Sequence, residues 1–78
     1  MNEFENLKTG YIDTIHYGMC QTGYNETMHG NEVLHKFCSM LVDNSSYSDS
    51  EKREMKYELD QIKEIISQEI EGFFSSRS

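Results

Sequence analysis

An amphipathic segment near the C-terminus, Ser48 to Phe74, constrains the fold more than any other part of this chain. Ser48 and Glu51 have the spacing of a capping box, in which each side chain accepts a hydrogen bond from the other residue's backbone amide at a helix start. The apolar side chains that follow recur every three or four residues, which places them on one side of an α-helix. They are Met55, Leu59, Ile62, Ile66, Ile70 and Phe73. The pattern predicts one long helix over 49–73 whose apolar stripe packs against other elements.

Two shorter helices are expected before it. Helical spacing from Glu3 to Cys20 predicts the first, and an apolar cluster ending near Asn44 predicts the second. The segment Gln21–Gly30 is expected to connect them, with Asn25 or Asn31 capping the second helix. We expect the core to contain Leu7, Tyr11, Ile15, Leu34, Phe37, Leu41, Leu59, Ile62 and Ile66.

These elements predict an all-α fold, a small three-helix bundle with a long C-terminal helix. Residues 1–78 would form a single domain with a frayed tail at 75–78. The alternative is an α+β fold with a short N-terminal strand or hairpin, because residues 9–17 are rich in side chains that favour strands. A chain of 78 residues buries only a small core, so its stability is marginal unless a metal, a partner or a second copy adds to it.

The charge of the chain limits its partners. The formal net charge is −7, from 14 acidic and 7 basic side chains. Direct binding of nucleic acid or of an anionic membrane is disfavoured, because both need clustered Lys and Arg. A basic protein surface is the favoured partner. The acidic N-terminus and the lack of a long apolar run predict a cytoplasmic protein with reduced thiols.

One constellation of side chains has the composition of a metal site. His16 and Cys20 share one face of the first helix, and His35 and Cys38 share one face of the second. Two nitrogens and two sulfurs suit tetrahedral zinc, which would also stabilise a small fold. No pair has tight Cys-x-x-Cys spacing, so we expect no cofactor and keep a zinc-stabilised structural module as the alternative.

Catalysis is not expected from this sequence. The Cys–His pairs are the only candidates for a nucleophile and its base, and no glycine-rich phosphate loop or nucleophile motif accompanies them. We therefore expect a protein that is not an enzyme.

The polar side of the C-terminal helix is the candidate binding surface. Tyr57, Asp60, Glu64 and Glu71 lie opposite the apolar stripe, where the tyrosine would serve as an aromatic anchor among carboxylates. The alternating charges beside the stripe also suit a parallel homodimer through this helix, since Glu51 and Glu58 would face Lys56 and Lys63 of a second copy.

These observations favour a non-enzymatic acidic binding protein, an inhibitor or regulator that occupies a basic site on a target protein. A nucleic-acid-binding site is a natural target, because carboxylates on a helix imitate phosphate charge. Ala, Pro and Trp are absent and residues with AT-rich codons are abundant, which suggests a viral or mobile-element source. A helical subunit of a homo-oligomeric assembly is the third hypothesis.

Overall fold

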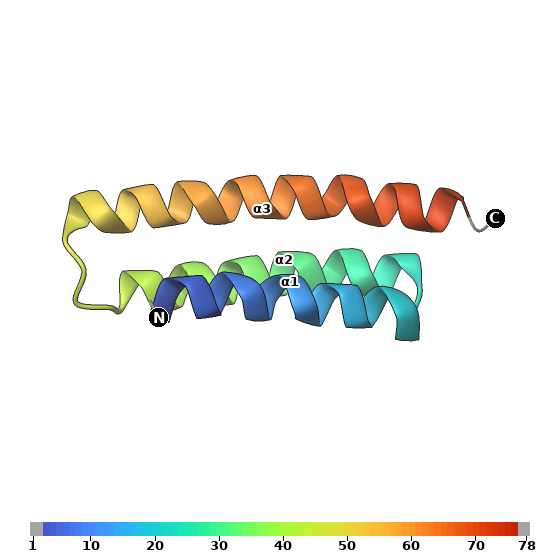
Figure 1. Cartoon of the computed structure of the whole chain (residues 1–78), viewed down its shortest axis with the longest axis horizontal. Helices are drawn as coiled ribbons and strands as arrows, with labels where there is room; N and C mark the ends of the chain where they lie inside the picture. Colours follow the sequence, from blue (N-terminus) through green and yellow to red (C-terminus); the bar gives the residue numbers. More distant parts are fainter. Residues whose placement is uncertain (1–2, 77–78) are drawn as a thin grey trace.

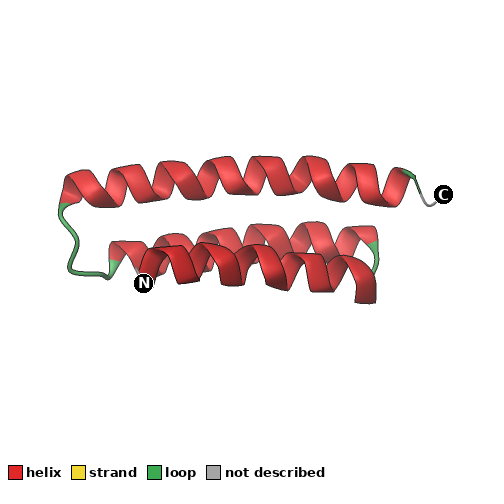
Figure 2. Cartoon of the chain, viewed as in Figure 1, coloured by secondary structure: helices red, strands yellow, loops and turns green. Residues whose placement is uncertain are grey.

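The computed structural model describes residues 3–76, which form three helices and no strand (Figures 1 and 2). Helix α1 spans Glu3–Gln21, α2 spans Tyr24–Asp43 and α3 spans Asp49–Ser75. Successive helices run antiparallel in a rod of about 45 × 18 × 18 Å, with α3 lying along the pair formed by α1 and α2. The predicted all-α bundle is confirmed. The alternative strand is wrong, since residues 9–17 lie within α1.

The connection between α1 and α2 is much shorter than predicted. Only Thr22 and Gly23 separate the two helices, so residues 24–30 are helical rather than a loop. Gly23 is the N-cap in an extended conformation, and neither Asn25 nor Asn31 has that position. The reason lies in Thr27, which is buried and donates a hydrogen bond from Oγ1 to the Gly23 carbonyl at 2.8 Å. Thr27 Oγ1 also lies 3.1 Å from Thr22 Oγ1 and 3.5 Å from the Gly18 carbonyl oxygen of α1, and these contacts tie the first turn of α2 to the end of α1.

Helix α3 begins as the sequence predicts. The Glu51 amide donates to Ser48 Oγ at 3.2 Å, and the Ser48 amide donates to Glu51 Oε1 at 3.1 Å, which completes the capping box. Such a cap typically stabilises a helix by about 1 kcal/mol. The helix continues without a break to Ser75, and Ser76 follows as its C-cap. Of the tail predicted to fray at 75–78, residues 77–78 lie outside the described part.

The core lies between α3 and the groove formed by α1 and α2. Its buried side chains are Phe4, Tyr11, Ile15, Met19, Cys38, Val42, Leu59, Ile66 and Ile70. Of the predicted core, Tyr11, Ile15, Leu59 and Ile66 are confirmed, and Leu7, Leu34 and Ile62 are partly buried. The prediction that Phe37 and Leu41 are buried is wrong, because these residues are 53% and 43% exposed. Helix α2 instead turns Thr27, Asn31, Cys38 and Val42 inward.

A buried polar cluster explains this rotation of α2. Asn31 is 1% exposed and accepts a hydrogen bond from the Tyr11 hydroxyl of α1. Its Nδ2 donates to the Lys63 carbonyl and to Ser67 Oγ of α3, both at 3.1 Å. One side chain therefore joins all three helices at the centre of the bundle. An amide in this position must face inward, and Phe37, on the other side of α2, is turned outward.

Candidate functional site

The four side chains of the predicted binding surface lie together on the outer side of α3. Tyr57, Asp60, Glu64 and Glu71 are all exposed, and the Tyr57 side chain is 64% exposed. Leu59, Ile66 and Ile70 occupy the opposite, inward side of the same helix. We call these four residues the α3 outer face. The helix thus separates the residues that hold the fold from those that face solvent.

Contacts from α2 hold two of the carboxylates in place. His35 Nε2 lies 2.6 Å from Asp60 Oδ1, and the Tyr24 hydroxyl donates to Glu71 Oε1 at 3.4 Å. Tyr24 in turn packs edge-to-face against Phe74, with the ring centroids 5.9 Å apart. Glu64 lies between these tethered groups and has no ion pair or hydrogen bond with any described side chain. These tethers limit the motion of the flanking carboxylates.

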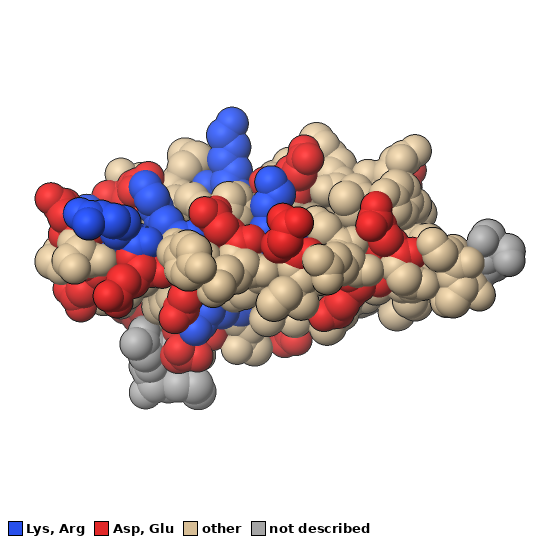
Figure 3. Space-filling view, turned by 90° about the horizontal axis from the view of Figure 1, so that it is seen from above, with Lys and Arg blue, Asp and Glu red and all other residues tan. Residues whose placement is uncertain are grey.

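The negative charge on this side of the molecule is less continuous than the sequence suggested. Basic and acidic side chains are interspersed over the surface that α3 presents, as Figure 3 shows. The bases belong to the N-terminal half of the helix and are Lys52, Arg53, Lys56 and Lys63. From residue 64 to 76, the described chain has three glutamates and no base. The acidic part of the surface is therefore the C-terminal half of α3.

This accumulation of glutamates opposes helix stability. The C-terminal end of a helix carries partial negative charge, so carboxylates near it are unfavourable. Helix α3 has no basic residue in its last turn, although Glu69 and Glu71 are close to it. Glu69 Oε2 lies 3.1 Å from Nε2 of His16 on α1. The remaining charge faces solvent and is available to an external cation.

The candidate metal ligands are not brought together. His16 pairs with Glu69 and His35 pairs with Asp60, on different parts of the surface. Cys20 is exposed on α1, whereas Cys38 is 2% exposed within the core. Within residues 3–76, no group of three or more His, Cys, Asp or Glu side chains is arranged to hold a metal ion. The geometry gives the zinc alternative no support.

The two thiols are expected to differ sharply in reactivity. Burial raises the pKa of the Cys38 thiol, which lowers its thiolate fraction at neutral pH, and it also shields the sulfur from reagents. We predict that Ellman's reagent modifies one thiol per folded chain at pH 8, and both thiols in denaturant. The Cys20→Ser variant should show almost no reaction until it unfolds. Rapid modification of both sites in the folded protein would contradict the buried position of Cys38.

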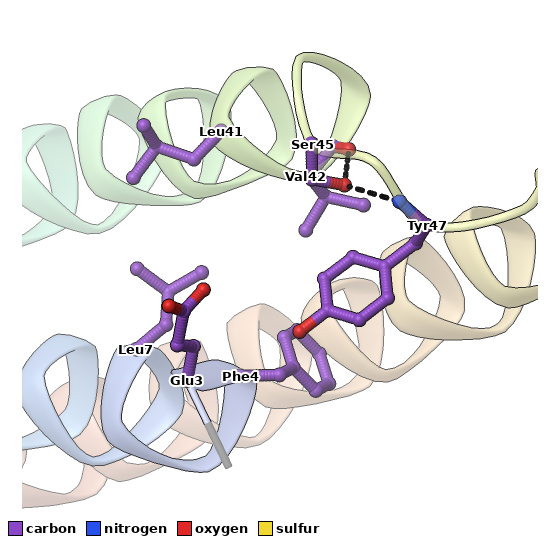
Figure 4. A pocket seen from close by; sticks show the side chains of 7 residues that line it. All are labelled: Glu3, Phe4, Leu7, Leu41, Val42, Ser45 and Tyr47. Carbon is purple, nitrogen blue, oxygen red and sulfur yellow. Dashed lines mark hydrogen bonds between the residues drawn. The ribbon is translucent and has the colours of Figure 1, made fainter.

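A hollow at one end of the bundle contains few groups that could take part in catalysis. It has a volume of about 240 Å³ and lies between the start of α1 and the end of α2 (Figure 4). Its lining consists of Glu3, Phe4, Leu7, Leu41, Val42, Ser45 and Tyr47. Ser45 Oγ donates to the Val42 carbonyl at 2.6 Å, and no histidine or lysine is part of the lining to activate it. The lining of the hollow is therefore predominantly apolar.

Sequence reasoning missed a second exposed surface, on α2. Val33, Phe37, Met40 and Leu41 are large apolar residues that are 43–53% exposed, and we call them the α2 stripe. The signal was present in their helical spacing. That spacing led to the wrong prediction that Phe37 and Leu41 are buried, because the side of α2 that faces the core contains Thr27 and Asn31.

Comparisons with known proteins do not extend this picture. None of the described helices is long and apolar enough to cross a membrane. The chain matches no protein-family model, no curated protein and no solved structure.

Proposed function

We propose that this chain is a non-enzymatic binding protein, an inhibitor or regulator whose α3 outer face occupies a basic site on a target protein. The observation that supports the proposal is the position of Tyr57, Asp60 and Glu64. They are exposed on one side of a 27-residue helix whose opposite side is committed to the core. Both free thiols suit action in a reducing cytosol.

Physical reasons favour this surface for binding a cationic partner. Carboxylates on a rigid helix lose little conformational entropy on docking, and two of them are already tethered by α2. The excess negative charge attracts a basic partner over roughly 10 Å at 0.1 M salt, which speeds association. Tyrosine is favoured at interfaces because a single ring buries a large area and its hydroxyl still forms a hydrogen bond. A nucleic-acid-binding protein is a suitable target, since its own site is basic.

The test begins with capture of binding proteins by the tagged chain and continues with kinetics on the purified partner. We expect that the double reversal Asp60→Lys with Glu64→Lys lowers the association rate constant at least about tenfold at low salt. The Tyr57→Ala variant should instead raise the dissociation rate constant, because an aromatic anchor acts after docking. Raising the salt concentration should reduce the difference between the parent and the double reversal.

A control separates the effect of position from that of net charge. The pair Asp13→Lys with Glu26→Lys changes the net charge equally at exposed positions on α1 and α2. This control should slow association only slightly, and all variants should keep the helical circular dichroism of the parent. If the control and the Asp60–Glu64 reversal slow association equally, the effect is one of net charge and the α3 outer face is not the docking site.

A further inference from the structure

The α2 stripe places four large apolar side chains in solvent along one side of a single helix. Phe37 and Met40 are each 53% exposed, Val33 is 50% exposed and Leu41 is 43% exposed. Their spacing places them beside one another on the outer side of α2, opposite Asn31 and the core. Contiguous apolar surface of this kind marks an interaction site more often than isolated exposed residues do.

The apolar surface continues from α2 onto α1. Leu41 faces Leu7 across the hollow at the end of the bundle, where Phe4 and Tyr47 complete the wall (Figure 4).

We propose that a second copy of this chain covers the α2 stripe, with the two α2 helices antiparallel and Phe37 of each packed against Met40 of the other. Phe37 and Met40 occupy adjacent positions of a heptad seam, and antiparallel helices pair such positions reciprocally. Because the dimer has a twofold axis, each of these contacts occurs twice. In this register Leu34 of each copy lies opposite Leu41 of the other. The half-buried Leu34 and the exposed Leu41 therefore both become part of the interface.

Charge complementarity selects this register. The same alignment sets Lys36 of each copy opposite Asp43 of the other, on the side of the seam away from α1. Both residues are exposed, and within the described chain Lys36 has no ion pair. Asp43 Oδ1 accepts from Lys56 at 2.9 Å, which leaves Oδ2 for a second lysine. Two symmetric ion pairs would thus flank the apolar contacts.

Other pairings of the same surface are less favourable. Sliding the antiparallel helices by one heptad, with Phe37 against Val33, sets Lys36 opposite Lys36 of the second copy. A parallel pair sets Lys36 opposite Leu41, where the ammonium gains no partner. Like charges across an interface are destabilising and give specificity against the wrong alignment. The proposed register is the one of the three that pairs opposite charges.

The dimer does not rest on the proposed function, because the α2 stripe and the α3 outer face share no residue. A dimer with this geometry carries two α3 outer faces. A variant that no longer dimerises but still associates with the target protein at the parental rate would therefore show that the two proposals are independent.

The primary test is the mass in solution, measured by sedimentation over micromolar to millimolar concentrations. The parent is expected to shift with concentration from the monomer of 9.2 kDa to twice that mass. Phe37→Glu and Met40→Glu should each raise the dissociation constant of the dimer at least tenfold. Neither change should unfold α2, because both side chains are exposed. Ile65→Glu is the matched control, since Ile65 is 56% exposed on α3, and it should leave the association unchanged.

A charge exchange tests the register itself. Lys36→Glu and Asp43→Lys should each weaken the homodimer, because like charges then oppose one another twice. An equimolar mixture of the two variants should form a heterodimer with near-parental affinity, since both charge pairs are restored. A monomer at all concentrations, a dimer indifferent to Phe37→Glu and Met40→Glu, or a mixture that fails to associate would each overturn the proposal.

Discussion

Replacing Leu59 with alanine is expected to lower the free energy of unfolding by about 3–5 kcal/mol. Leu59 is 0% exposed near the middle of α3, and removing three carbons leaves a cavity that the surrounding helices fill only in part. Small domains are stabilised by roughly 5–15 kcal/mol, and a chain this short lies towards the lower end. The variant should therefore be partly unfolded at 25 °C. Urea titration followed by circular dichroism measures the change as a lower midpoint at an unchanged slope.

The control for this prediction lies on the same helix. Ile65 is 56% exposed, so Ile65→Ala removes little buried area and introduces a better helix former. We expect its stability to stay within about 0.5 kcal/mol of the parent. Ile62 is partly buried and should give an intermediate loss. Equal losses at Leu59 and Ile65 would mean that α3 does not pack as described.

The contrast between α3 and α2 shows how far sequence patterns determine this fold. In α3 the capping residues, the apolar spacing and the polar outer side agree, so its start and its inward side were predicted correctly. In α2 the more apolar side of the helix is the exposed one, and the inward side contains Thr27 and Asn31. Periodicity favours the wrong side there. The partners of Asn31 are far away in the sequence, and local patterns contain no information about them.

The candidate site divides in the same way. The positions of Tyr57, Asp60 and Glu64 on the outside of α3 follow from helical spacing alone. Their tethers do not, because His35 and Tyr24 meet Asp60 and Glu71 only when α2 packs beside α3. The separation of Cys38 from Cys20 likewise depends on how each helix is rotated in the bundle. Residues that share a face within one helix can be predicted, whereas contacts between helices require the packed structure.

The second large effect is expected at the buried amide of Asn31. Replacing Asn31 with leucine keeps the number and branching of the side-chain heavy atoms but removes the Oδ1 acceptor of the Tyr11 hydroxyl, which keeps only the Asn31 backbone carbonyl, 3.1 Å away. The Ser67 hydroxyl and the Lys63 carbonyl lose a donor as well. Loss of hydrogen bonds between buried polar groups costs about 1–3 kcal/mol, so the total loss from the three broken contacts should be about 2–4 kcal/mol. Tyr11→Phe alone should cost about 1–2 kcal/mol, because Asn31 keeps its contacts with α3.

Combining the two changes tests whether Tyr11 and Asn31 stabilise the bundle through their hydrogen bond or only through packing. In the double variant Tyr11→Phe with Asn31→Leu, both side chains are apolar, so there is no longer a buried hydroxyl that has lost one of its two acceptors. The loss should be smaller than the sum of the single losses by about 1–2 kcal/mol. The double variant also lacks the one side chain that joins all three helices, and its amide hydrogens should exchange faster than its stability alone implies. If the two changes are additive in urea titration, Tyr11 and Asn31 stabilise the bundle independently. The rotation of α2 that exposes Phe37 would then need another cause.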